Sequence, residues 1–326
     1  LTGERMPTPT SQQSAAPRES RRSPDGTREL EFDGRALVVH ELATSKRVTL
    51  LSPPADRELS YQKPTWSPDG RRVVFVEIDA TDVRKRAVVD ASDPSYPTVH
   101  HHRFARVGEA IERRRVGVID SDGQHLTWLP LPSPAEGFYL GQVEWANNSD
   151  EVLVEQQSRF RNRREFFLVR TTGEPKRVFH EENEAWTDAS QQKNAGLTWI
   201  RGGAEFVVVN ETDGWRHAHR WSRDGKALAV LTPGHYDLID RAWIDEPGGW
   251  YYFYASPDNA TQKHLYRVPL DGSGTLERIT PADQPGTHDY VFSPDAKWAI
   301  HTHSRLDSPP IVDLVELPRH RGVRVL

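Results

Sequence analysis

The sequence predicts an all-β protein, a β-propeller built from repeated four-stranded blades. The first observation is a turn, WSPDG at residues 66–70, which returns as RSPDG at 22–26, WANNSD at 145–150 and FSPDA at 292–296. Proline presets φ in such a turn and glycine accepts positive φ, so each copy is typical of a hairpin bend. The second is spacing: 44 residues separate Trp199 from Trp243 and 49 separate Trp243 from Phe292. One propeller blade takes roughly 40 to 50 residues.

Runs of β-branched and aromatic residues between turn formers predict the individual strands. The C-terminal half gives three quartets of such runs, at 197–200, 204–211, 216–222 and 226–232; at 241–245, 250–256, 264–270 and 276–280; and at 289–293, 297–304, 310–317 and 323–326. The N-terminal half gives three less regular sets, at 27–32, 35–42 and 46–51; at 64–67, 71–78, 113–120 and 125–131; and at 142–146, 151–157, 164–170 and 176–180. We therefore expect about six blades in this chain.

One interval departs from the repeat. Trp66 and Trp145 are 79 residues apart, which is too long for a single blade. The polar stretch at 79–104 is the expected insertion in this long blade.

Composition limits the domain organisation and the partners. Residues 1–19 are rich in Pro, Ser, Thr and Gln, and we expect a flexible or incomplete segment there, followed by one propeller domain at 20–326. The net charge of −5, from 42 basic and 47 acidic residues, argues against a nucleic-acid partner. No apolar run reaches the ~20 residues of a membrane span, and no signal peptide opens the chain.

A search for catalytic and metal-binding motifs is negative. The sequence has no cysteine and no GxSxG, HExxH, P-loop or GxGxxG pattern, so we expect no catalytic residues and no cofactor in this chain. The histidines at 100–102, at 217 and 219, and at 301 and 303 could chelate a metal in pairs, but matching further ligands are missing, so we expect ordinary packed or surface histidines and no metal. The pair Glu181-Glu182 is interpreted as a solvated loop, and the basic runs 113–115 and 161–164 as solvated loops or strand edges.

Three segments then indicate a family. NETDGWRHAHRW at 210–221, YASPDNATQKHLYRVPLDG at 254–272 and HDYVFSPDAKWAIHTHSRLDSPPIVDL at 288–314 resemble, in order, segments of the dipeptidyl peptidase IV family of serine peptidases. Upstream, EIDATDVRKRAVVD and RFARVGEAIERRRVGVID resemble that family's long blade. The resemblance covers nearly the whole chain, from about Ser23 to Leu326.

The resemblance implies an eight-bladed propeller followed by an α/β-hydrolase domain that supplies Ser, Asp and His. Six blades are visible here, and the chain ends about where the hydrolase domain would begin, so we expect an incomplete propeller without its catalytic domain. The implied partners are a peptide substrate, that C-terminal hydrolase domain and a second copy in a homodimer. The implied location is periplasmic or secreted. The implied work is substrate gating and binding of the peptide N-terminus; the alternative is a free-standing TolB-like binding propeller, which shares the WSPDG turns.

Members of this family bind the peptide's α-amino group through paired glutamates shortly before the WSPDG blade. The corresponding stretch here, PADRELSYQKPTWSPDG, has no Glu-Glu pair. Asp56 and Glu58 lie eight to ten residues before Trp66 and are the candidate substrate-binding residues, because two carboxylates can hold an ammonium. The alternative for this stretch is a polar loop between blades.

Overall fold

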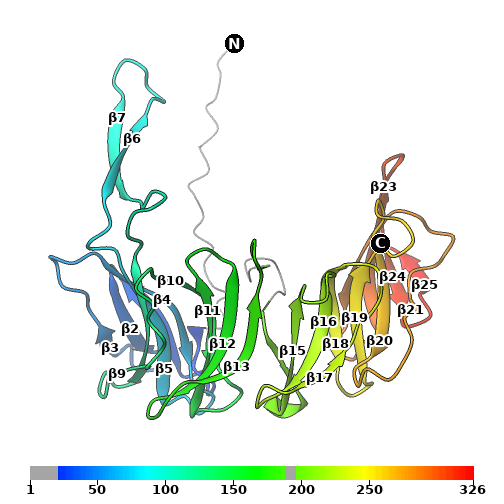
Figure 1. Cartoon of the computed structure of the whole chain (residues 1–326), viewed down its shortest axis with the longest axis horizontal. Helices are drawn as coiled ribbons and strands as arrows, with labels where there is room; N and C mark the ends of the chain where they lie inside the picture. Colours follow the sequence, from blue (N-terminus) through cyan, green and yellow to red (C-terminus); the bar gives the residue numbers. More distant parts are fainter. Residues whose placement is uncertain (1–20, 188–195) are drawn as a thin grey trace. The chain divides into compact units, whose positions relative to one another are not determined.

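The computed structural model describes residues 21–187 and 196–326. These residues form β-strands connected by turns, with the short 3-10 helix η2 (Arg201–Gly203) and no α-helix among them. Most strands form antiparallel sheets in sequence order, as in propeller blades (Figure 1). The predicted all-β fold class is confirmed, while the segment 1–19 lies outside the described residues. No helix in the described ranges is long or apolar enough to cross a bilayer.

The chain divides into two compact units. Unit 1 comprises residues 1–154 and 168–175, and unit 2 comprises residues 155–167 and 176–326. Unit 1 holds β1 (Arg28–Asp33), β2 (Ala36–Glu41), β3 (Arg47–Leu51), β4 (Leu59–Trp66), β5 (Arg72–Asp79), β6 (Lys85–Asp90), β7 (Thr98–Arg103), β8 (Arg113–Asp120), β9 (Thr127–Trp128) and β10 (Phe138–Trp145). β1-β2-β3 form a three-stranded sheet, β4-β5-β8-β9 a four-stranded one, and β6-β7 a separate hairpin.

The strands β11 (Glu151–Ser158) and β12 (Arg163–Arg170) contain the boundary between the units. Unit 2 also holds β13 (Lys176–Glu182), β14 (Thr198–Ile200), β15 (Glu205–Asn210), β16 (His217–Ser222), β17 (Ala227–Val230), β18 (Leu238–Asp245), β19 (Trp250–Ala255), β20 (His264–Pro269), β21 (Glu277–Arg278), β22 (Thr287–Phe292), β23 (Trp298–Arg305), β24 (Ser308–Glu316) and β25 (Arg321–Val325). The four-stranded sheets are β10-β11-β12-β13, β14-β15-β16-β17, β18-β19-β20-β21 and β22-β23-β24-β25. Apart from the two-stranded sheet β6-β7, the described residues form six sheets, one of three strands and five of four, which correspond to the six expected blades.

The repeated turn has one hydrogen-bond pattern. In WSPDG the Ser67 amide donates to the Arg72 carbonyl at 2.8 Å, and the Gly70 amide donates to the Ser67 carbonyl at 2.8 Å. The Ser67 hydroxyl donates to Asp69 at 2.6 Å and accepts the Arg72 amide at 2.9 Å. The same bonds recur at Ser23 and Ser293. The serine and aspartate side chains therefore stabilise the hairpin turn by hydrogen bonds, which explains why the sequence repeats these two residues.

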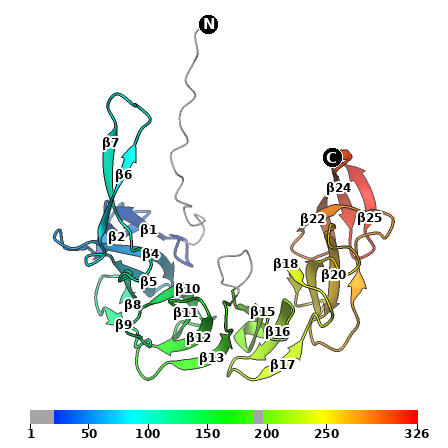
Figure 2. The ribbon, with the colours of Figure 1, turned by 45° about the horizontal axis from the view of Figure 1, so that its top comes forward.

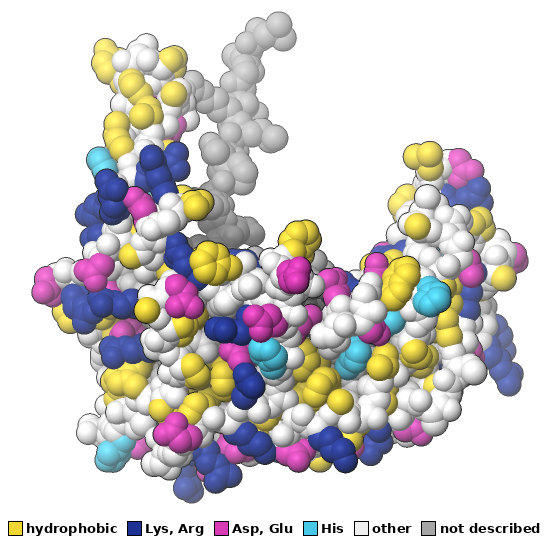
Figure 3. All heavy atoms as spheres, in the orientation of Figure 1, with side chains coloured by type: hydrophobic (Ala, Val, Ile, Leu, Met, Phe, Trp, Pro, Cys, Tyr) yellow, Lys and Arg dark blue, Asp and Glu magenta, His cyan; other side chains and the backbone are white. Residues whose placement is uncertain are grey.

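The interval between β5 and β8 carries the hairpin β6-β7, which projects from its sheet (Figures 1 and 2). β5 pairs directly with β8, so this segment adds to the blade without interrupting it. All residues of β6 are exposed, and β7 is exposed up to Arg103. Apolar side chains lie toward the tip and basic ones nearer the base (Figure 3).

Each unit has its own apolar core. In unit 1, Leu37, Val73 and Phe75 are buried within one cluster, and Gly117 on β8 leaves room for the Phe75 ring, because a Cβ there would lie 2.5 Å from its Cζ atom. In unit 2, one cluster forms around Phe253 and a second packs on the opposite face of β19 around Tyr254. Burying such a side chain contributes about 1.5–3 kcal/mol.

Two expectations about charged residues were wrong. Glu181 lies in β13 and is buried, not in a solvated loop, and Arg164 from the basic run has a side chain with 0 % exposure. Arg164 Nε donates to Glu155 at 2.7 Å, and its Nη1 lies 3.8 Å from Glu181 and donates to the Val209 carbonyl at 3.3 Å. A buried charge needs such partners, and these come from three other strands that the sequence pattern does not connect.

Candidate functional site

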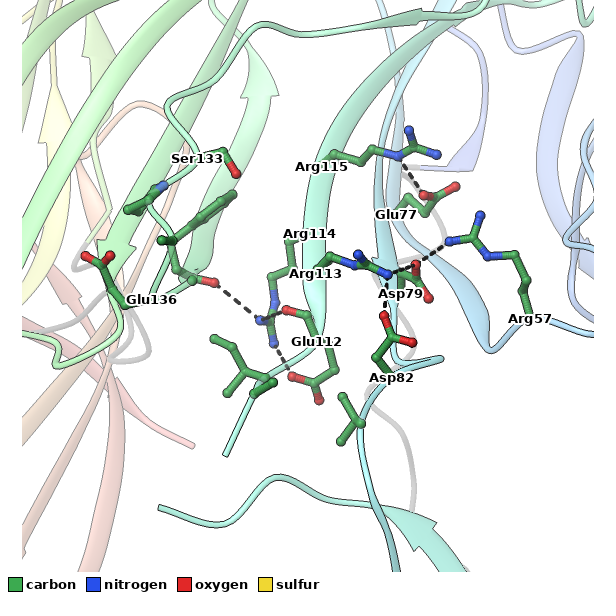
Figure 4. A pocket seen from close by; sticks show the side chains of 17 residues that line it. Arg57, Glu77, Asp79, Asp82, Glu112, Arg113, Arg114, Arg115, Ser133 and Glu136 are labelled. Atoms are coloured by element: carbon green, nitrogen blue, oxygen red, sulfur yellow. Dashed lines mark hydrogen bonds and ion pairs between the residues drawn. The ribbon is translucent and has the colours of Figure 1, made fainter. Parts of the chain in front are cut away.

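A cavity of about 690 Å³ lies in unit 1, where β5 ends and β8 begins. Its charged lining residues come from the loop before β4, from both of these strands and from their connections (Figure 4): Arg57, Glu77, Asp79, Asp82, Glu112, Arg113, Arg114, Arg115 and Glu136. Apolar residues, among them Val83, Ile111 and Phe138, complete the wall. The size is within the range of ligand pockets in proteins, about 300–1,000 Å³.

Asp79 is the buried centre of the ion pairs in this cavity. Its Oδ2 atom lies 2.5 Å from Arg57 Nη2 and 3.5 Å from Arg113 Nη2, so it lies between two guanidinium groups (Figure 4). Burial raises the pKa of Asp79, but hydrogen bonds from Thr81 and the charge of Arg57 outweigh it and leave this pKa below its usual value. Arg113 also pairs with Asp82 at 2.6 Å. The ion pair between Asp79, at the end of β5, and Arg57 thereby fixes the loop before β4.

Two further ion pairs lie in the wall of this cavity. Glu77 is buried and accepts a bond from Arg115 Nε at 2.7 Å, while the Arg115 guanidinium lies over the Trp128 ring at 3.5 Å from its centroid. Arg114 pairs with Glu112 at 3.1 Å. The buried carboxylates of the cavity are therefore matched by arginines, which gives a polar site of mixed charge.

The two predicted binding residues flank Arg57 but do not line this cavity. Asp56 is exposed in the turn that precedes Arg57. Glu58 lies just before β4, with 48 % of its side chain exposed, and its Oε1 atom is 3.6 Å from Arg103 Nη2 at the base of hairpin β6-β7. Arg103 is itself held by the carbonyls of Thr81 and Val83, at 2.7 and 2.6 Å. The sequence did not indicate this arginine.

The histidines considered as metal ligands lie in different surroundings. Those at 100–102 are exposed on β7, whereas His217, His219 and His301 are buried. Within the described ranges, no group of three or more His, Cys, Asp or Glu side chains is arranged to hold a metal ion.

A histidine cluster in unit 2 was not foreseen. His288 Nδ1 and His301 Nε2 share a hydrogen bond of 2.9 Å, His301 Nδ1 lies 2.8 Å from Asp313, and His288 Nε2 lies 3.0 Å from the Gln284 carbonyl. Burial lowers the pKa of His301, and it lowers the pKa of His288 to about 3, so both imidazoles are neutral and supply protons for only two of these three contacts. His303 also stacks on His288, at 4.4 Å between ring centroids.

Two neighbouring imidazoles are held neutral. Burial, together with the charge of Arg278, lowers the pKa of His264 to about 4. Burial and the nearby His301 likewise lower the pKa of His320 to about 4. His320 also shares a 2.9 Å hydrogen bond with the Tyr290 hydroxyl. The sequence places these residues on different strands and turns, so only the fold brings them together.

Comparison with known proteins identifies the family. A profile of the "Dipeptidyl peptidase IV (DPP IV) N-terminal region" matches residues 56–310. The chain belongs to this family. It is 25% identical over 260 residues to dipeptidyl-aminopeptidase B of Aspergillus niger, a match that covers 72% of this chain and 28% of the fungal protein. The chain thus spans under a third of the length of this curated relative.

The fold also matches solved structures. The crystal structure of dipeptidyl peptidase 4 from Porphyromonas gingivalis superposes with a TM-score of 0.82 at 20% sequence identity, covering 94% of this chain and 44% of that one. At this identity the likeness concerns the fold alone. It agrees with the β-propeller expected from the repeated turns.

Proposed function

We propose that this chain is the substrate-gating propeller of a dipeptidyl peptidase IV-like serine peptidase and that it binds the free N-terminus of a peptide. The observation that supports this most is the family match over 56–310, which begins at Asp56. The full enzyme would add a C-terminal α/β-hydrolase domain in the same polypeptide and work as a homodimer in the periplasm or outside the cell. The propeller would admit short or unfolded peptides and orient their N-termini.

In this proposal, Asp56 and Glu58 receive the peptide ammonium. Both side chains are exposed and belong to one short segment, so they can reach a ligand without first being uncovered. Glu58 already contacts Arg103, with 3.6 Å between the Glu58 Oε1 and Arg103 Nη2 atoms, and both side chains are partly exposed. Ion pairs of this kind contribute little to stability. A charge-assisted hydrogen bond to an ammonium contributes roughly 1.5–3 kcal/mol, enough to displace it.

Isothermal titration calorimetry tests the proposal on this chain. We expect Ala-Pro-Ala-amide to bind and its N-acetylated form to bind at least about tenfold more weakly, using ~1.4 kcal/mol per decade. Asp56→Asn and Glu58→Gln should each remove much of that difference. Asp33→Asn, an exposed carboxylate elsewhere in unit 1, is the control and should not. Equal binding of the two peptides, or variants that bind like the wild type, would contradict the assignment.

A further inference from the structure

Unit 2 contains a second cavity, of about 770 Å³, between the edge strands β18 and β22. Six consecutive residues, 239–244, line it from β18. A regular strand presents only every second side chain to one face. Register shifts between Leu238 and Asp240, and between Arg241 and Trp243, break this alternation. Such bulges change the direction of side chains and are frequent beside binding sites. They allow consecutive residues of β18 to line this cavity.

The two walls of this cavity carry charges of both signs. On the β22 side, Lys263 Nζ pairs with Asp289 Oδ1 at 2.5 Å and lies 5.0 Å from the centroid of the Tyr254 ring. On the β18 side stand the carboxylate of Asp240 and the guanidinium of Arg241, which donates to Thr198. Each wall therefore offers one cation and one carboxylate to a ligand that bridges them.

Apolar surface lies between these charges. Ile239 is 40 % exposed and Val291 is 69 % exposed, although both belong to strands of the sheet framework. Trp243 is partly buried and stacks on Phe292, with 6.0 Å between ring centroids. Exposed aliphatic side chains next to a tryptophan suit an apolar side chain of a ligand.

We propose that this cavity binds a short peptide with both termini free. Lys263 holds the peptide's carboxylate, Asp240 on the opposite wall holds its ammonium, and Ile239, Trp243 and Val291 contact its apolar side chains. A dipeptide or tripeptide has this combination of charges and fits a volume of about 770 Å³. The site is separate from Asp56 and Glu58, which lie in the other unit. It binds the C-terminus of the peptide as well as its N-terminus.

The ion pair of Lys263 with Asp289 does not prevent this binding, and Asp240, which already accepts a hydrogen bond from the Arg241 amide at 2.9 Å, would add the peptide's ammonium to its existing partners. The Lys263 side chain is 23 % exposed and that of Asp289 is 58 % exposed. A partly exposed pair contributes little to stability, because water and salt screen it. When a peptide carboxylate contacts Lys263, Asp289 remains hydrated, so the exchange leaves no buried unpaired charge.

Calorimetry with three related ligands tests the site: Ala-Leu, N-acetyl-Ala-Leu and Ala-Leu-amide. We expect Ala-Leu to bind and each capped ligand to bind at least about tenfold more weakly, because each lacks one charge-assisted contact. The amide keeps its ammonium and can still bind an amine site at Asp56 and Glu58. Binding that is lost on amidation therefore reports the cavity in unit 2, whatever becomes of the site in unit 1.

Point variants locate the binding. Lys263→Gln and Asp240→Asn should each weaken the Ala-Leu complex at least about tenfold, and Lys263→Gln should also abolish the preference for Ala-Leu over its amide. Lys297→Gln, which removes an exposed lysine in the turn between β22 and β23, is the matched control and should leave binding unchanged. Circular dichroism confirms that the variants are folded. No binding of Ala-Leu at millimolar concentration, or equal binding by wild type and both variants, would overturn the proposal.

Discussion

The buried guanidinium of Arg164 makes the strongest energetic prediction for unit 2. The side chains of Arg164 and Glu155 are both 0 % exposed, and Glu181 beside them is 4 % exposed. The substitution Arg164→Met retains a long, unbranched side chain but removes the positive charge. It leaves two carboxylates buried with one fewer cation and leaves the Val209 carbonyl without its guanidinium donor.

Breaking a buried ion pair by removing one partner costs about 3–5 kcal/mol. We therefore expect Arg164→Met to lower the free energy of unfolding by this amount. With an m-value of about 2 kcal/mol per molar urea, the urea midpoint of the transition should fall by about 1.5–2.5 M. Tryptophan fluorescence follows this transition. The double variant Arg164→Met/Glu155→Gln should recover part of the loss, because it also removes one uncompensated charge.

Arg177→Met is the matched control. Arg177 pairs with Glu165 at 2.8 Å on an adjacent part of the same sheet, but its side chain is 55 % exposed. Its loss should cost less than about 1 kcal/mol. If Arg164→Met is no more destabilising than Arg177→Met, then the buried pair does not contribute as described, and the account of this core is wrong.

Three further predictions follow from the turns, the histidines and the missing catalytic motifs. His264 and His320 have folded pKa values of about 4, below the value of about 6.5 in the unfolded chain. Their contribution to the free energy of unfolding is therefore complete above pH 6.5 and is lost as the pH falls toward 4. The urea midpoint should be lower at pH 5 than at pH 7.5, and His264→Gln should reduce that difference. Gly225→Ala should destabilise by more than Gly214→Ala, since both glycines have φ near +90° but only at Gly225 would a Cβ lie 2.7 Å from a backbone oxygen; equal midpoints in thermal unfolding would refute this. The chain alone should release no chromophore from an Xaa-Pro chromogenic substrate, and turnover blocked by a serine-directed phosphonate would contradict that expectation.

Local chemistry made much of the fold predictable. The serine, aspartate and glycine of WSPDG act within six residues of one another, so the sequence alone indicates the bend and the strand that follows it. Strand ends were less accurate: β4 begins at Leu59 and β18 at Leu238, whereas the predicted runs began at 64 and 241. These early positions mix apolar residues, Leu59 and Leu238 among them, with polar ones, so they form no clear β-branched run, but backbone pairing extends through them.

The features that could not be predicted depend on contacts between distant strands. Arg164 and Glu181 have the composition of solvated residues, and only their burial together makes them a core pair. The two bulges of β18 leave no clear mark in the sequence, although they determine which side chains enter the cavity of unit 2. Asp56 and Glu58 were identified because they lie close to where the resembling family carries its paired glutamates, and their role stays a prediction.

A crystal structure of this chain with Ala-Pro-Ala-amide would test the central proposal most directly. The account predicts that the peptide's ammonium nitrogen lies within hydrogen-bond distance, about 2.7–3.2 Å, of the carboxylates of both Asp56 and Glu58, with Glu58 turned away from Arg103. An ammonium group that lies in solvent, or that contacts other carboxylates while Glu58 keeps its contact with Arg103, would contradict it.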